Sequence, residues 1–239
     1  MKLVRNDWES QFFGREIYRL RSECELAQKE LQCSLRNAPR ADLFEASLPA
    51  ERLDTLAVLT GAGFWVADIL VDFEASANCR SDLSFGGEVT VAVATDADLP
   101  GLLDTCMSLH FGSRYYQRPF RYEDGNRYYS LWTENAVRGQ FDDICFIARK
   151  DRHITSFACA RKVGSDGARI GLIGTKAADR GSGTTEMVWQ RVASWAQSMG
   201  RNRLFVQTQL GNSRAIQFYS KMGARIRSSR IHTYYSPGS

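Results

Sequence analysis

The sequence lacks any apolar run long enough to cross a membrane. A membrane-spanning helix needs about 20 consecutive apolar residues, and no segment of the 239-residue chain approaches that length. The opening stretch, residues 1–9, also lacks the apolar core and the small-residue cleavage site of a secretory signal. We therefore expect a cytoplasmic protein with no membrane span.

Histidine is scarce, and the cysteines are not paired in sequence. The chain has three histidines, none at a metal-ligand spacing from another, and six cysteines without a C-x-x-C motif. Several cysteines lie in apolar runs, which favours buried, reduced thiols over a disulfide framework. The cysteines are Cys24, Cys33, Cys79, Cys106, Cys145 and Cys159. We expect no metal site, because the usual nitrogen and sulfur ligands are not grouped.

A strong charge of one sign is missing as well. The 31 basic residues outnumber the 27 acidic ones by only four, and the two kinds are interleaved along the chain. Nucleic-acid-binding proteins usually carry a continuous basic stripe, so this distribution disfavours that class. The balance suits a small anionic ligand better. A homodimer is compatible with this charge distribution.

The hydrophobic pattern predicts two parts, separated by a polar, glycine-bearing stretch at residues 79–87. The first part reads as alternating strands and helices, in the order β-α-β-α-β. The predicted elements are a strand at 15–20, a helix at 22–35, a strand at 41–48, a helix at 50–60 and a strand at 64–73. Ser22 and Glu25 form a capping-box pattern at the first helix. We predict a smaller α/β domain over residues 1–87 and a larger domain over 88–239.

In the larger part, the hydrophobic pattern predicts three adjacent antiparallel strands between helices. Short polar turns separate the three strand-like runs, which is typical of hairpins. The predicted elements are a strand at 88–93, a helix from Thr95 to 109, a helix at 125–137, strands at 144–148, 154–162 and 168–175, a helix ending at 199, a strand at 203–208, a helix at 212–222 and closing strands at 224–235. The helix-glycine-strand order at residues 50–73 is echoed at 212–235, which suggests that the first part is a shortened copy of the second.

The most informative stretch is the glycine-rich turn at residues 180–183, between a predicted strand and a long helix. Glycines let the backbone approach a ligand closely, and a helix start offers unpaired N–H groups and the positive end of the dipole. A pyrophosphate would fit this turn. The spacing alone leaves a purely structural loop as the alternative, because the turn is neither a Walker nor a dinucleotide motif.

A second motif follows about thirty residues later, in N-S-R-A-I-Q-F-Y at 212–219 and M-G-A at 222–224. The two motifs together resemble the GNAT acetyltransferases, whose acetyl-CoA loop reads [QR]-x-x-G-x-[GA] and whose next helix reads N-x-x-A-x-x-x-Y before a closing glycine. The matching residues are Arg180, Gly183, Asn212, Ala215, Tyr219 and Gly223. Thr185 departs from the expected Gly or Ala, and Ala224 replaces the usual aromatic residue. The resemblance covers about residues 88–235.

This resemblance implies an α+β GNAT fold, with a mixed, mostly antiparallel central sheet flanked by helices and a truncated GNAT-like α/β domain in front. It implies acetyl-CoA as the co-substrate. The implied cofactor-binding residues are Ile173, Gly174 and Thr175 for the pantetheine arm, Arg180, Gly181, Ser182, Gly183 and Thr184 for the pyrophosphate, and Asn212 and Ala215 on the next helix.

The resemblance also implies that Tyr219 is the general acid that protonates the departing thiolate. A phenol with a pKa of about 10 is protonated at neutral pH and can be regenerated, since a thiol has a pKa near 8.5. A tyrosine that only packs in the core is the alternative. The sequence nominates no single Glu or His as the base that keeps the attacking amine neutral, and a water chain to solvent is a reasonable substitute.

A closer resemblance appears in W-E-S-Q-F-F-G at 8–14 and in Y-Y-S-L-W-T-E-N-A-V-R-G at 128–139. Both stretches are similar to the dTDP-fucosamine acetyltransferases, which acetylate the 4-amino group of dTDP-4-amino-4,6-dideoxygalactose and carry a truncated GNAT-like domain in front. The resemblance implies a nucleotide-sugar acceptor. Another small amine, a peptide N-terminus or a non-catalytic acyl-CoA-binding module are the alternatives.

The segment between residues 111 and 129 interleaves arginines with aromatic residues. Arginines can form paired hydrogen bonds with a diphosphate and aromatic rings can stack on a base, so this segment could hold a sugar nucleotide. The candidate substrate residues are Arg114, Arg118, Arg121 and Tyr122. Core aromatics beside solvated arginines are the equally weighted alternative.

Overall fold

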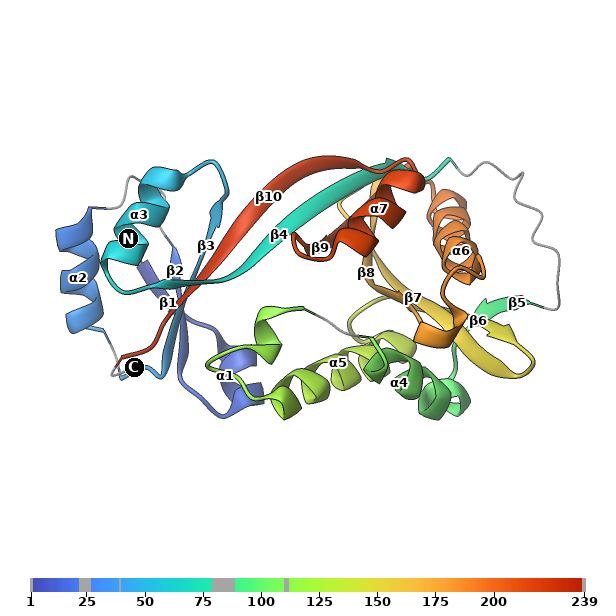
Figure 1. The fold of residues 1–239 in the computed structure, drawn as a ribbon, viewed down its shortest axis with the longest axis horizontal. Coiled ribbons are helices and arrows are strands. Elements are labelled where there is room, and N and C mark those ends of the chain that lie inside the picture. Colours follow the sequence, from blue (N-terminus) through green and yellow to red (C-terminus); the bar gives the residue numbers. More distant parts are fainter. Residues whose placement is uncertain (1, 22–26, 39, 79–88, 110–111, 238–239) are drawn as a thin grey trace.

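The computed structural model describes residues 2–21, 27–38, 40–78, 89–109 and 112–237, and these form one continuous ten-stranded sheet (Figure 1). The strand order is β1-β2-β3-β10-β4-β9-β8-β7-β6-β5. The strands are β1 Lys2–Arg5, β2 Ile17–Arg21, β3 Leu43–Pro49, β4 Trp65–Ser76, β5 Thr90–Val93, β6 Ile144–Lys150, β7 His153–Val163, β8 Gly167–Thr175, β9 Arg203–Gln209 and β10 Arg225–Tyr235. Only β2–β3 and β8–β9 pair in parallel among the described strands. The predicted mixed, mostly antiparallel sheet is confirmed.

Seven α-helices and three 3₁₀ helices accompany this sheet in the described part of the chain. The α-helices are α1 Asp7–Phe13, α2 Gln28–Arg36, α3 Leu53–Gly61, α4 Leu99–Met107, α5 Tyr122–Val137, α6 Thr184–Ser198 and α7 Ser213–Lys221. The 3₁₀ helices are η1 Asp96–Asp98, η2 Arg114–Tyr116 and η3 Ala177–Asp179. None of the helices among these described residues is long and apolar enough to cross a lipid bilayer.

Helices cover both faces of the sheet around β7. Successive side chains of a strand point to opposite faces, and Ala158 and Ala160 belong to the core beneath α6 and α7. Phe157 and Cys159 belong to a second core beneath α4 and α5. The result is a three-layered body at one end of the molecule, which is coloured green to red in Figure 1. The predicted antiparallel set β6, β7 and β8 is confirmed.

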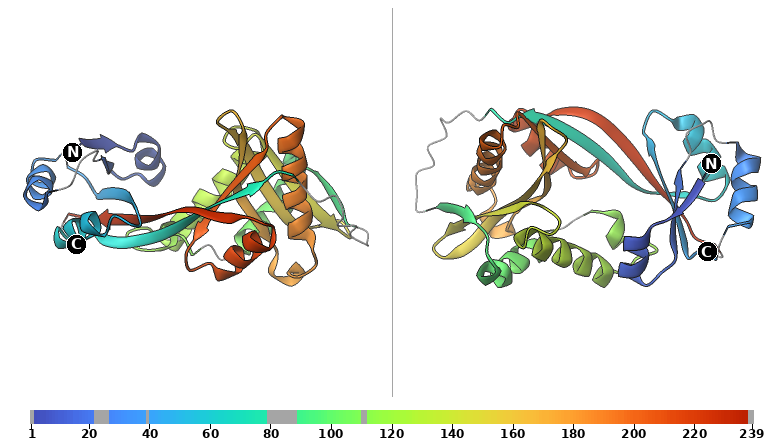
Figure 2. Two further views of the ribbon diagram at one scale, coloured as in Figure 1. Left: turned by 90° about the horizontal axis from the view of Figure 1, so that it is seen from above. Right: turned by 180° about the vertical axis from the view of Figure 1, so that it is seen from behind.

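The long strands β4 and β10 connect this body to the N-terminal strands. They pair antiparallel along most of their length, and in two further views they form a ribbon that spans the molecule (Figure 2). The strand β4 also pairs with β9, while β10 also pairs with β3. Each part of the chain therefore contributes a strand to the other part's region of the sheet. The predicted boundary at 87/88 and the linker at 79–87 lie outside the described residues.

The structure adds elements that the sequence pattern did not reveal. We predicted neither β1 nor α1, and α5 begins at Tyr122 instead of at residue 125. The helix predicted at 22–35 is described from Gln28 onward, so its capping box at Ser22 and Glu25 lies outside the described residues. The two closing strands are one continuous strand, β10.

The cysteine prediction holds in part. Cys106, Cys145 and Cys159 are buried free thiols, as predicted. Cys33 is exposed, so the prediction of burial is wrong there, because Cys33 lies on the solvent side of α2. Cys24 and Cys79 lie outside the described residues.

Candidate active site

Two parallel strands part in the middle of the sheet and leave open backbone edges. The ladder between β8 and β9 runs from Gly167–Arg203 to Ile170–Val206 and ends there, although β8 continues to Thr175 and β9 to Gln209. At the same point the register between β7 and β8 shifts, leaving Gly171 as the extra residue of a bulge. A β-bulge bends its strand. This bend accounts for the separation of β8 from β9.

The glycine at the bulge is required by close packing. A Cβ atom on Gly171 would lie 2.7 Å from the Asp142 Oδ2 atom and 3.1 Å from the Trp132 Cζ2 atom. Beyond this glycine, residues 172–175 pair with β7 on one side and with no described strand on the other. The predicted pantetheine-binding residues Ile173, Gly174 and Thr175 lie on this open edge.

The glycine-rich turn leads directly into α6. Gly181 and Gly183 both have φ of +82°, a left-handed conformation that costs other residues about 1–2 kcal/mol. Gly183 occupies the N-cap position of the 15-residue helix, and no side chain caps it. The first N–H groups of an α-helix have no partner within the helix. The head of α6 is therefore suited to bind an anion.

A cluster of hydroxyl groups fixes the turn to the end of β8. The buried Ser156 hydroxyl lies 2.7 Å from the Thr175 hydroxyl and 2.6 Å from the Thr184 hydroxyl. Thr175 also hydrogen-bonds to Thr185, and Ser182 Oγ lies 3.0 Å from Thr184 Oγ1. The departure from the motif at Thr185 thus adds one more bond between β8 and α6.

A groove of about 770 Å³ runs between the open end of β8 and helix α7. We call it the β8–β9 groove. Most residues predicted to bind the cofactor line it, and so does the predicted acid: Ile173, Gly174, Thr175, Arg180, Gly181, Asn212, Ala215 and Tyr219. Ser182, Gly183 and Thr184 lie next to it, in the turn and at the head of α6. The structure therefore gathers both sequence motifs around one groove.

Tyr219 is buried at the inner end of the groove. It is 4% exposed, and its ring lies 5.5 Å from the ring of Phe73 and 5.8 Å from the ring of Trp189, measured between centroids. Burial raises the pKa of Tyr219 above its ordinary value of 10. The phenol is thus held protonated at neutral pH.

Asn212 caps the helix that carries Tyr219. Its Oδ1 atom accepts a hydrogen bond from the Ala215 backbone N–H at 3.2 Å, and its Nδ2 atom donates to Thr208 Oγ1 at 3.1 Å. An asparagine at the N-cap satisfies one of the free N–H groups of the first turn. The side chain therefore holds α7 against β9 and sets the position of the phenol two turns later.

A second cavity, of about 310 Å³, lies on the inner side of Tyr219. We call it the central cavity. It shares Ile173, Asn212, Ala215 and Tyr219 with the β8–β9 groove. A molecule in the groove and a molecule in the central cavity would therefore meet at the phenol.

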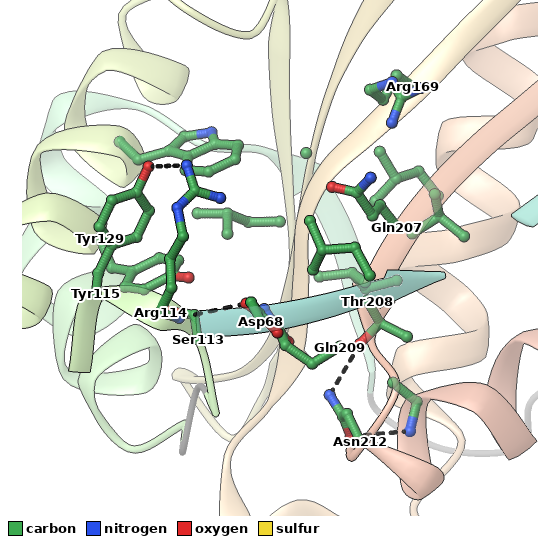
Figure 3. Close-up of a pocket in the computed structure, with 18 of the residues that line it drawn as sticks. Asp68, Ser113, Arg114, Tyr115, Tyr129, Arg169, Gln207, Thr208, Gln209 and Asn212 are labelled. Carbon is green, nitrogen blue, oxygen red and sulfur yellow. Dashed lines mark hydrogen bonds between the residues drawn. The ribbon is translucent and has the colours of Figure 1, made fainter. Parts of the chain in front are cut away.

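Charged and aromatic side chains from distant segments line the central cavity (Figure 3). Arg114 precedes α5, and Arg161 and Arg169 come from β7 and β8. Tyr128, Tyr129 and Trp132 lie on α5. Asp68, from β4, accepts a hydrogen bond from the Arg114 backbone N–H at 3.3 Å. The cavity thus combines three cations, one carboxylate and several rings.

Of the four predicted substrate residues, Arg114 lines this cavity and the other three do not. Arg118 stacks over the ring of Trp65, with its Cζ atom 4.8 Å from the ring centroid. Arg121 and Tyr122 lie at the exposed start of α5. No sequence pattern indicates Asp68, Arg161 and Arg169, because their strands show ordinary alternation and only the sheet brings the three together.

The two stretches of closer resemblance contact each other beneath the central cavity. Glu9 accepts a hydrogen bond from the Tyr115 hydroxyl at 2.7 Å, and Tyr115 accepts one from Arg114 at 2.7 Å. The rings of Trp8, Phe12 and Phe13 lie 5.7, 6.0 and 6.4 Å from the ring of Tyr128. Both stretches therefore support the same wall of the cavity.

Within the described residues, no three His, Cys, Asp or Glu side chains gather into a group that could hold a metal ion.

Comparison with known proteins agrees with this geometry. Residues 109–224 match the acetyltransferase (GNAT) family. The chain is 32% identical over 230 residues to the dTDP-fucosamine acetyltransferase of Escherichia coli O6:H1, a match that covers 95% of each protein.

Solved structures show the same fold at low identity. A GCN5-related N-acetyltransferase from Kribbella flavida superposes with a TM-score of 0.63 at 14% identity, covering 94% of this chain and 82% of that one. A tandem GNAT protein of clavulanic acid biosynthesis superposes with a TM-score of 0.61 at 10% identity, covering 93% and 76%. With the two motifs assembled around one groove and a relative this similar along nearly its whole length, the chain belongs to the GNAT family and is an acetyl-CoA-dependent N-acetyltransferase.

Proposed function

We propose that the protein transfers the acetyl group of acetyl-CoA to the 4-amino group of a dTDP-linked 4-amino-4,6-dideoxy sugar, by direct attack in a ternary complex. The observation that carries this proposal is the meeting of two cavities at Tyr219. One is a groove suited to a pyrophosphate and a pantetheine arm. The other is lined by arginines and aromatic rings.

On the donor side, the head of α6 binds the pyrophosphate of acetyl-CoA through backbone N–H groups of the 180–184 turn. The pantetheine arm lies along the open edge of β8 like an added strand and pairs with backbone groups of Ile173, Gly174 and Thr175. This arrangement directs the thioester toward Tyr219, at the inner end of the groove.

The reaction needs a proton donor for the leaving thiolate. The neutral amine attacks the thioester carbonyl carbon, the C–S bond breaks, and Tyr219 gives its proton to the sulfur. The tyrosinate then regains a proton from the nitrogen of the tetrahedral adduct. Burial raises the pKa of the phenol, so its oxygen holds the proton before the reaction, and the transfer to sulfur is coupled to the tyrosinate's uptake of the more acidic proton on the adduct nitrogen.

On the acceptor side, Arg161 and Arg169 are better placed for a sugar-linked diphosphate than Arg118 or Arg121. Both line the central cavity with Arg114, and guanidinium groups bind phosphate oxygens in pairs. Trp132 and the exposed Phe141, whose rings lie 5.1 Å apart, offer aromatic surface at the same end for the nucleobase. The substrate named for the Escherichia coli relative, and the two stretches that support this wall, favour a nucleotide sugar. We propose that the reaction takes place in the cytoplasm.

A thiol-release assay tests the proposal. Purified protein with acetyl-CoA and dTDP-4-amino-4,6-dideoxygalactose should release CoA thiol far above the rate without acceptor. A panel containing the C4 epimer, a polyamine, an aminoglycoside and a peptide separates the alternatives. Turnover of another amine but of neither sugar would overturn the acceptor assignment, and binding of acetyl-CoA without turnover of any amine would indicate a non-catalytic module.

A further inference from the structure

The central cavity has one carboxylate among the described residues that line it, and no histidine. That carboxylate is Asp68, which is 8% exposed and comes from β4, in the N-terminal part of the chain. The other charged residues in the wall are the cations Arg114, Arg161 and Arg169. Among the described lining residues, Asp68 is therefore the one carboxylate that could take a proton from an amine.

The hydrogen bonds that the Asp68 carboxylate accepts leave it one acceptor position for a further donor. The carboxylate accepts hydrogen bonds from the backbone N–H groups of Arg114 and Ile69 and from the Gln209 side chain. A carboxylate has about four acceptor positions. In Figure 3, Asp68 lies between the Arg114 segment and the β9 residues Thr208 and Gln209. The carboxylate is thus held by three donors and also lines the cavity.

The pKa of the Asp68 carboxylate suits a group that gains and loses a proton near neutral pH. Burial raises the pKa of Asp68 from 3.8 to about 6, and the hydrogen bond and charge of Arg114 oppose this rise. The charged group that acts on it directly is Arg114, and Arg161 and Arg169 line the same cavity. His232, which faces Asp68 in the β4–β10 register, stays neutral, because burial first and the nearby arginines second lower its pKa to about 3.

A proton taken up by Asp68 has a route away from the reaction. Asp68 also lines a neighbouring cavity of about 540 Å³, together with Gly112, Leu210 and Gly211. Gln209 and Asn212 line both spaces. The carboxylate therefore borders the central cavity and a second space that water can enter.

We propose that Asp68 is the general base of the reaction: its carboxylate binds the acceptor's ammonium group and removes one proton to give the neutral amine that attacks the thioester. The ammonium proton moves to a carboxylate oxygen, and the nitrogen lone pair forms the new C–N bond. The C–S bond then breaks, and Tyr219 and the adduct nitrogen exchange one proton as described above. In that exchange the Tyr219 proton goes to the sulfur and the adduct nitrogen gives its proton to the tyrosinate, so the one net proton released resides on Asp68 until it is lost to water. This proposal rests on the proposed function only in requiring that an amine be acetylated in this cavity.

The test is the pH dependence of kcat/KM for wild type and Asp68→Asn, with the acceptor that the wild type acetylates best. The wild type should lose activity as pH falls through about 6, because the base becomes protonated. Asp68→Asn should reduce kcat/KM at pH 7 by about 10²- to 10⁴-fold. The defect should shrink toward pH 9, because the free amine then supplies its own neutral form.

Two further variants separate this role from a structural one. Asp68→Glu should keep part of the activity and the acidic limb of the profile. Glu74→Gln, on the same strand but in a surface ion pair with Arg203, should match the wild type. Acetyl-CoA affinity, measured by calorimetry, should be unchanged in all variants.

Several results would overturn the proposal. They are a wild-type profile that is flat between pH 5 and 7, a defect in Asp68→Asn that is equal at pH 7 and pH 9, or a fully active Asp68→Asn. Because the acceptor is chosen by wild-type turnover, failure of the nucleotide sugar as substrate leaves this test intact, and the two failures are distinguishable.

Discussion

Two helix-strand units have the same backbone arrangement but carry different side chains. They are α3–β4 in the first part of the chain and α7–β10 in the second part. Both helices are nine residues long and are followed by a glycine with positive φ, Gly63 or Gly223. The Phe64 N–H donates to the Leu59 carbonyl at 3.0 Å, and the Ala224 N–H donates to the Tyr219 carbonyl at 2.9 Å. The helix ends are therefore built in the same way.

The difference lies in the buried residue of each helix. Leu59 is the one buried residue of α3, and Tyr219, at the same position in the helix, is the one buried residue of α7. The strands after the two helices pair with each other and extend into each other's part of the sheet. This near-symmetry supports the prediction that residues 1–87 are a shortened GNAT-like copy. The buried residue of α7 is thus a phenol at the cavity, whereas the buried residue of α3 only packs in the core.

The largest effect is expected from making the two helices alike. Tyr219→Leu and Tyr219→Phe should each lower kcat by about 10²- to 10⁴-fold, because the acid is lost while the groove remains. Calorimetry should show acetyl-CoA affinity close to that of the wild type for Tyr219→Phe. Full activity in this variant would remove the acid role and, with it, the functional difference between the units.

A truncation at the matching residue of α3, Leu59, should lower the stability of the protein and leave its catalysis unchanged. Leu59 is 1% exposed and packs in the core formed by α2, α3 and the N-terminal strands. Leu59→Ala should lower the free energy of unfolding by about 2–5 kcal/mol. Denaturant unfolding measures this, and kcat per folded molecule should equal that of the wild type. A selective loss of kcat would contradict the assignment of α3 as structural.

A smaller effect is expected at the two helix starts. Asn212 caps α7 through its side chain, whereas Arg52, the matching residue before α3, makes no cap and bonds to Asp54 at the surface. Asn212→Ala should cost about 1 kcal/mol of stability and raise the KM for acetyl-CoA. Arg52→Ala should change stability by less than about 1 kcal/mol. Equal losses in thermal unfolding would refute the difference in capping.

The smallest effect is expected at Thr185, the position that departs from the family motif. Removing its hydroxyl in Thr185→Ala breaks a hydrogen bond to Thr175, which is worth about 0.5–1.5 kcal/mol. The KM for acetyl-CoA should rise by no more than about tenfold, at unchanged kcat. Steady-state kinetics with varied acetyl-CoA measure this. A fall in kcat comparable to that of Tyr219→Phe would show that the catalytic difference between the units is not confined to α7.

The grouping of the proposed donor-side residues around one groove could be predicted from the sequence, because these residues lie in two short, local motifs. The turn at 180–184 and the helix at 212–219 each carry their geometry in neighbouring residues. The acceptor side could not be predicted in this way. Asp68, Arg114 and Arg161 come from three separate segments, and only the insertion of β4 between β10 and β9 brings Asp68 next to α7.

The same reasoning explains what was missed in the fold. The antiparallel strands β6 to β8 follow one another in sequence, and their turns predict their pairing. The pairing of β4 with β9 and β10 joins residues at least 127 positions apart, and no local pattern encodes it. The strand β1 is four residues long, too short for a clear alternation.

The most direct test of the account is a crystal structure with CoA and dTDP-4-amino-4,6-dideoxygalactose bound together. We predict that the pyrophosphate lies on the 180–184 turn, that the sulfur atom lies within hydrogen-bonding reach of the Tyr219 hydroxyl, and that the sugar amine lies in the central cavity. CoA bound outside the β8–β9 groove, or an amine on the far side of the protein from Tyr219, would contradict it.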